Sequence, residues 1–109
     1  MLLKQNRIPR SLFGLFKGKT INLSNDLFFV KVVKGDGLSR FCFSVSKKIA
    51  KKAVIRNKMR RLGYTELNER LERLKSGFLA IFYFRKIPES RNEIGKSLDL
   101  LLKKTNLIK

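Results

Sequence analysis

The chain has 109 residues and a mass of 12.7 kDa, which is enough for one domain, residues 1–109, with one hydrophobic core. Its 26 lysines and arginines outnumber 8 acidic residues, giving a formal net charge of +18. This excess excludes an ordinary soluble enzyme surface and favours a nucleic-acid partner, while 43% hydrophobic residues predict folding rather than disorder.

Residue types that carry out catalysis are scarce. The chain has no histidine, which excludes Ser-His and Cys-His nucleophile pairs, and its one cysteine, Cys42, makes neither a zinc site nor an internal disulfide. A lone cysteine fits a reducing cytoplasm. The longest apolar run, residues 78–84, is too short to span a membrane, and no signal peptide, phosphate-binding loop or dinucleotide motif is evident. We therefore expect a cytoplasmic protein with no catalytic or metal-binding residues, no membrane partner and no small-molecule substrate.

The first half of the chain predicts a short helix followed by strands. The helix is capped by Ser11 and ends near Gly18. Residues 20–25 form a polar link with some strand character, and residues 27–33 and 40–46 read as strands, separated by a glycine-containing turn. We expect these two strands to pair as a hairpin. The second strand alternates, and the positions expected in the core are Phe41, Phe43 and Val45.

The segment from Ser46 to Leu62 has eight basic residues and no acidic one. A helix from about Lys52 would place Ile55, Met59 and Leu62 on one apolar stripe. The opposite arc would then carry Arg56, Asn57, Arg60, Arg61 and Tyr64. Arginine binds phosphate oxygens, asparagine binds backbone or base edges, and an aromatic ring stacks on an unpaired base, so this arc suits RNA. The alternative is a solvated basic face.

The second half predicts a helix, an interior strand and a closing helix. Gly63 is expected to bend or restart the basic helix, at a cost of about 1 kcal/mol relative to alanine. Residues 78–84 are apolar on both faces and so predict an interior strand. Ser90 and Glu93 form a capping box before a helix over residues 91–104. Three carboxylates are expected to form surface ion pairs: Glu66, Glu69 and Glu72.

The motif S-V-S-K-K, followed by seven residues from Ile49 to Ile55 and then by R-N-K-M-R-R-L, resembles the signature of the bacterial ribonuclease P protein subunit. The likeness extends more loosely over nearly the whole chain. One departure is Tyr64, because the family usually has another arginine there. The implied fold is α+β, a single two-layer domain with a short helix, two or three strands, the long basic helix, a strand and a C-terminal helix. In that family the βαβ crossover through the basic helix is left-handed, against the usual rule.

The resemblance implies a ribonucleoprotein endonuclease that removes the 5′ leader of precursor tRNA. Its RNA subunit, with bound Mg²⁺, performs the cleavage, and the protein binds that RNA and the leader. The residues implied to bind the RNA are Lys47, Lys48, Lys51, Lys52, Arg56, Asn57, Lys58, Arg60 and Arg61. Those implied to bind the leader are Phe13, Phe16, Lys31 and Tyr64.

Several alternatives remain open on the sequence. The resembling family has two aromatics four residues apart at the leader cleft, whereas this chain has Leu12 and Phe16 in that register or Phe13 and Phe16 three apart. Either pair could serve the leader, and Phe13 is equally a candidate for the core. A structural ribosomal protein would share the charge, the size and the lack of catalytic groups. A basic membrane-surface module would need an exposed apolar patch beside the lysines.

Overall fold

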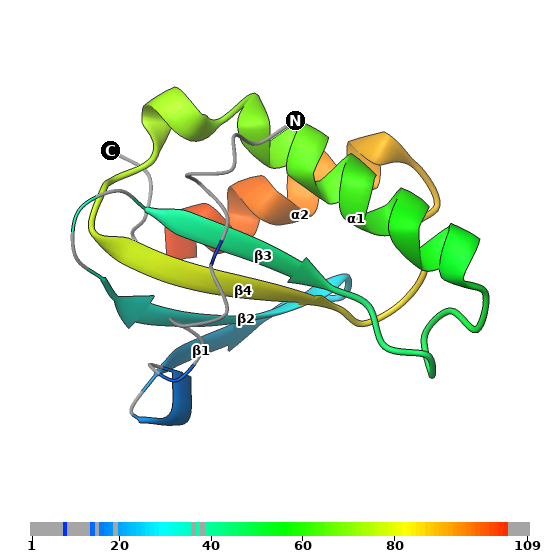
Figure 1. The fold of residues 1–109 in the computed structure, drawn as a ribbon. Helices are drawn as coiled ribbons and strands as arrows, with labels where there is room; N and C mark the ends of the chain where they lie inside the picture. The colour runs from blue at the N-terminus through cyan, green and yellow to red at the C-terminus, as the bar shows by residue number, and fades with distance from the viewer. Residues whose placement is uncertain are drawn as a thin grey trace.

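The computed structural model describes residues 8, 14, 16–18, 20–35, 37 and 39–104. A four-stranded sheet is covered on one face by two helices (Figure 1), which confirms the predicted α+β class and element order. The elements are β1 (Ile21–Ser24), β2 (Phe28–Lys34), β3 (Arg40–Ser44), α1 (Ala53–Asn68), a 3₁₀ turn η3 (Leu71–Arg73), β4 (Phe78–Phe84) and α2 (Arg91–Lys104). Most of the predicted N-terminal helix, Ser11 to Phe13 included, lies outside the described residues; Gly14, Phe16 and Lys17 have 3₁₀ conformation.

The strand order β1-β2-β4-β3 shows that the predicted hairpin between β2 and β3 is wrong. β4 lies between them, antiparallel to β2 and parallel to β3. Six of its seven residues are buried, so the strand that is apolar on both faces takes the interior position, as predicted. β1 pairs with β2, which makes three strands before α1. The left-handed sense of the β3-α1-β4 crossover stays a prediction.

The main core lies between the sheet and the two helices. Phe28, Phe43 and Phe82 point from neighbouring strands to the helix side and are at most 2% exposed. The Phe43 and Phe82 rings stack with centroids 5.0 Å apart. From the helices, Met59 and Leu98 complete the same buried cluster. The predicted burial of the alternate β3 side chains is therefore confirmed, and burial of such large rings is the main source of stability.

Gly63 does not restart α1, which was one of the two expected outcomes, because the helix runs without interruption from Ala53 to Asn68. A Cβ atom at this position would lie 2.8 Å from Cδ1 of Phe43. The missing side chain lets the helix approach β3 closely. The propensity cost of glycine is thus offset by packing against the Phe43 ring.

The prediction that the glutamates of the basic helix form only surface ion pairs is wrong. Glu66 is 7% exposed and bonds to Arg70 and Arg91 at the contact between α1 and α2. Glu69, which is exposed, also pairs with Arg91. The sequence spacing is compatible with the pair of Glu66 and Arg70, four residues apart, but it could not show that a second helix closes over Glu66.

Helix α2 begins and ends where the sequence predicts. Ser90 Oγ accepts a hydrogen bond from the Glu93 backbone N–H, as in a capping box, while the Glu93 carboxylate accepts from the Glu89 N–H rather than from that of Ser90. Among the described residues, neither helix has the length and apolar character needed to cross a membrane.

Candidate nucleic-acid interface

Four lysines of the basic segment lie in the connection between β3 and α1. All four are exposed: Lys47, Lys48, Lys51 and Lys52. Lys52 is the N-cap residue of α1, makes no capping bond through its side chain, and the first turn has no acidic residue. Cations at the positive end of a helix dipole repel it, so a bound anion would relieve an unfavourable field here.

Arg56 holds this connection in place. Its Nη1 atom donates hydrogen bonds to the carbonyl oxygens of Ala50, at 2.8 Å, and Lys51, at 2.7 Å. The side chain is only partly exposed. The residue that was predicted to contact RNA therefore also fixes the backbone that carries Lys51 and Lys52.

The outward side of α1 is polar and basic. Asn57, Lys58 and Arg61 are exposed, and Arg60 is partly exposed. Arg60 donates a hydrogen bond to the side-chain oxygen of Asn57, and this bond orients the Asn57 amide group. No acidic side chain lies between Lys47 and Arg61 in the sequence, so the field along this arc is uncompensated by its own segment.

Tyr64 lies at the outer edge of β3, where the Ile8 N–H also donates to the Phe41 carbonyl oxygen at 3.3 Å. Its hydroxyl oxygen accepts a hydrogen bond from the Phe43 N–H at 3.3 Å, and its ring packs edge-on against the Phe43 ring at 5.0 Å. The contact satisfies a backbone donor that an edge strand leaves unpaired. The structure thus brings Tyr64 to the border between α1 and the face of the sheet that the helices do not cover.

The face of the sheet that no helix covers, called the uncovered face below, carries a second cluster of candidate side chains. Part of this face is buried, because Ile8 packs there against Val33, Leu79 and Ile81. Lys31 lies over the Tyr83 ring with its Nζ atom 5.9 Å from the centroid, and Phe29 is the cross-strand partner of Tyr83, with ring centroids also 5.9 Å apart. Phe16 packs on the apolar patch of this face, together with Ile81. Phe16 and Lys31 therefore share one face, whereas Phe13 lies outside the described residues.

Sequence reasoning missed Phe29 and Tyr83 as members of this face. Alternation along residues 78–84 places Tyr83 on the same side as Leu79 and Ile81, which is a signal the sequence contains. The pairing of Tyr83 with Phe29 could not be found, because the expected hairpin put β3 rather than β4 beside β2.

The thiol of Cys42 is one further group whose surroundings affect its chemistry. Burial raises the pKa of the Cys42 thiol, against a hydrogen bond from Tyr64 and the positive charge of Arg60. A neutral thiol is a poor nucleophile at neutral pH.

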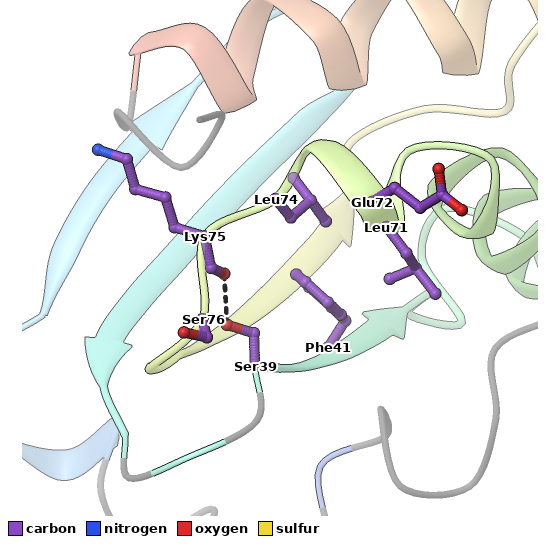
Figure 2. A pocket seen from close by; sticks show the side chains of 7 residues that line it. All are labelled: Ser39, Phe41, Leu71, Glu72, Leu74, Lys75 and Ser76. Carbon is purple, nitrogen blue, oxygen red and sulfur yellow. Dashed lines mark hydrogen bonds between the residues drawn. The ribbon is translucent and has the colours of Figure 1, made fainter.

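Two pockets lie away from the border between α1 and the uncovered face. One of about 260 Å³ is shown in Figure 2, at the starts of β3 and β4 beside η3; there Ser39 Oγ donates to the Lys75 carbonyl oxygen at 2.7 Å. Its floor is formed by Phe41, Leu71 and Leu74, with no converging set of ionisable groups. The other, of about 290 Å³, lies between α1 and residues 87–91. Among the described residues no group of three or more acidic, histidine or cysteine side chains is placed to hold a metal ion.

The arrangement suits the binding of a polyanion with unpaired bases. It offers a continuous series of cations along α1 and its preceding loop, and aromatic rings with a lysine on the adjoining sheet face. Cations neutralise phosphates, and rings stack on unpaired bases.

The Ribonuclease P family model matches residues 4–106. A curated relative, the ribonuclease P protein component of Microcystis aeruginosa, is 36% identical over 74 residues, which cover 66% of this chain and 62% of the relative. The chain thus spans less than two thirds of the length of that relative.

Solved structures have the same fold. A mutant RNase P protein of Staphylococcus aureus with defective mRNA degradation activity superposes with a TM-score of 0.85 at 24% identity, covering 96% of this chain and 92% of the other. The RNase P protein of Thermotoga maritima gives a TM-score of 0.79 at 25% identity, covering 90% and 96%.

Proposed function

The chain belongs to the ribonuclease P protein family, and from that premise we propose that it is the protein subunit of a ribonuclease P ribonucleoprotein. In this role it binds the catalytic RNA and the 5′ leader of precursor tRNA and assists endonucleolytic removal of the leader. The observation that carries the proposal is the basic arc of α1 beside an uncovered, aromatic sheet face, in a chain of this family.

The RNA subunit is proposed to bind along α1 and the loop before it. The exposed cations there carry no acidic neighbour from the same segment, and guanidinium groups suit phosphate oxygens. The proposed contacts are Lys47, Lys48, Lys51, Lys52, Arg56, Asn57, Lys58, Arg60 and Arg61. For Arg56 the carbonyl bonds to Ala50 and Lys51 support an additional role in holding the loop.

The leader is proposed to lie on the uncovered sheet face. Phe16 and Lys31 are both on this face, and Tyr64 stands at its border. Tyr83 and Phe29 join the proposal because Lys31 lies over the Tyr83 ring and the Phe29 ring packs beside that of Tyr83. A single strand needs aromatic surfaces for its bases and cations for its backbone, and this face offers both. Phe13 remains a proposed contact on sequence grounds alone.

The chemistry of cleavage is proposed to belong to the RNA subunit. Mg²⁺ held mainly by that RNA would activate the nucleophile and stabilise the leaving group. This chain's own residues contribute positioning and neutralisation of phosphate charge. Its high Cys42 pKa and its lack of histidine support a role without a protein nucleophile or general base. The place of action is proposed to be the cytoplasm.

Membership of the family favours this role over the alternative of a structural ribosomal protein. The test is reconstitution with a bacterial ribonuclease P RNA at low Mg²⁺, followed by an assay for removal of the 5′ leader from precursor tRNA. We expect the chain to stimulate cleavage and a ribosomal protein of similar charge not to do so. Equal stimulation by both proteins would reduce the role to generic RNA binding.

A further inference from the structure

An ion cluster lies on the side of α1 that is turned away from the basic arc. Asn57 and Glu66 are nine residues apart, which at about 100° per residue places them on opposite sides of the helix. Asn57 is exposed and Glu66 is buried, in agreement with that placement. Glu66 itself, which is 7% exposed, is therefore turned away from a partner that binds the arc at Asn57.

Glu66 is bonded on both carboxylate oxygens. Arg91, the first residue of α2, donates from Nε to Oε2, and Arg70 donates from Nη1 to Oε1 at 3.3 Å. Arg70 also binds Asp99 of α2 with two bonds, of 2.7 Å from Nε and 3.2 Å from Nη2. One buried carboxylate and one nearly buried guanidinium thus join the two helices in a fixed geometry.

Gly95 lets the helices come close enough for these bonds. Arg70 Nη2 donates to the Gly95 carbonyl oxygen at 3.3 Å. A Cβ atom on Gly95 would lie 2.8 Å from Oε1 of Glu66 and 2.9 Å from Nη2 of Arg70. The Glu66 carboxylate and the Arg70 guanidinium therefore occupy the space that a side chain at position 95 would need.

Such a cluster contributes more to geometry than to stability. Desolvation of buried charges offsets most of their attraction, whereas the directional bonds allow only one arrangement of the two helices. The chain has a net charge of +18 and only eight acidic residues. Three of these bind Arg70 or Arg91 on this side of α1: Glu66, Glu69 and Asp99. Most of the ion pairs of the described residues thus lie at the α1–α2 contact, with Lys86 and Glu93 as a further pair, and none of them involves the basic arc of α1.

We propose that Glu66 is a positioning residue for RNA binding. It anchors the side of α1 opposite Asn57 to α2, and this contact fixes the orientation of the basic arc. The proposal rests on the proposed function, because it assumes that the arc binds the ribonuclease P RNA. Glu66 does not contact the RNA and acts only through Arg70 and Arg91.

The test is the affinity of Glu66→Gln for a bacterial ribonuclease P RNA, measured at a temperature at which circular dichroism shows every variant to be folded. The substitution adds one unit of positive charge, so electrostatics alone would leave binding unchanged or make it tighter. Loss of positioning would instead weaken binding, by about 2- to 30-fold, as for other packed networks that touch no ligand. Misplaced cations would also lower the slope of log K against log salt.

Two further variants keep the test decisive. Glu72→Gln makes the same charge change at an exposed residue of η3 and is expected to bind at least as tightly as the wild type. Gly95→Ala changes no charge and raises helix propensity, yet its Cβ displaces the cluster, so we expect a loss in the same range as for Glu66→Gln. If Glu66→Gln fails to fold, Gly95→Ala decides.

Wild-type affinity or tighter binding in folded Gly95→Ala, or in folded Glu66→Gln, would overturn the inference while leaving the proposed function intact. If the wild-type chain itself shows no preference for this RNA over an unrelated RNA of equal length, the proposed function fails first. The two failures are therefore distinguishable.

Discussion

At the scale of single residues, Arg56 differs from the other cations of its helix. Two carbonyl oxygens of the preceding loop accept hydrogen bonds from its Nη1 atom, whereas Arg61 is exposed. The planar guanidinium fork can serve both carbonyls and still present donors to a phosphate. An ammonium group has the same charge but not this geometry.

We predict that Arg56→Lys lowers affinity for the ribonuclease P RNA by about fivefold, since an unanchored loop must be ordered on binding at a cost of ~1 kcal/mol. Arg61→Lys is the matched control, because it keeps the charge of an exposed position, and it should change the affinity much less. Binding by filter retention or fluorescence anisotropy measures both. Equal losses in the two variants would show that Arg56 acts only as a point charge.

The residue types of the candidate site could be predicted from the sequence, but not all of their partners. Helical spacing was sufficient to place Asn57 and Arg61 on one exposed arc. It could not show that Arg56 binds Ala50 and Lys51, because those bonds depend on the path of an irregular loop. It also could not show the burial of Glu66, which requires α2 to pack over it.

At the scale of elements, the sheet shows where local pattern is insufficient. The bounds of β4 and α2 follow from runs and caps that lie within the elements. Strand order depends on a contact between β2 and β4, which are separated by β3 and the whole of α1. Alternation along each strand gave the buried faces correctly, since that period is a property of the strand alone.

The uncovered sheet face provides a test of the leader contacts. We predict that Phe16→Ala weakens binding of precursor tRNA with a leader much more than binding of mature tRNA, because the ring, which packs on this face, is proposed to stack on a leader base. Holoenzyme is reconstituted with the wild-type chain or with Phe16→Ala, and the affinity of each for the two tRNAs is measured by titration. Equal losses for both tRNAs, or a variant that unfolds, would instead indicate that Phe16 serves the apolar cluster it packs against.

The α1–α2 contact predicts a dependence of stability on pH. The hydrogen bond from Arg70 lowers the pKa of Asp99 in the folded state. The folded chain therefore holds this proton less tightly than the unfolded chain, so the pair stabilises the fold above the ordinary aspartate pKa near 4. This contribution is lost as the pH falls through the lowered pKa.

We accordingly expect Asp99→Asn to reduce the free energy of unfolding at pH 7 by about 0.2–1 kcal/mol, a small value because 44% of the Asp99 side chain is exposed. At about pH 2 the difference from the wild type should largely vanish. Urea titrations at the two pH values measure it. A difference that persists undiminished at the lower pH would contradict an ionic role for Asp99.

At the scale of the whole molecule, the charge distribution determines how the chain meets a polyanion. A net charge of +18 costs stability through self-repulsion, and an anionic partner relieves it. Several acidic residues are gathered at the contact between α1 and α2, while the outward arc of α1 and its preceding loop are basic. A polyanion is therefore expected to approach from the α1 side and to lie next to the uncovered face of the sheet.

The most direct test of α1 as the RNA-binding element is the salt dependence of binding to the ribonuclease P RNA for two doubly neutralised variants. Lys58→Gln with Arg61→Gln removes two exposed cations from the arc of α1, and Lys103→Gln with Lys104→Gln removes two exposed cations from the end of α2. We predict that the first pair lowers the slope of log K against log salt by roughly 0.7 to 0.9 for each phosphate that is no longer neutralised, and that the second leaves it nearly unchanged. Equal changes in the two variants, or an unchanged slope in the first, would contradict the assignment of α1 as the RNA-binding element.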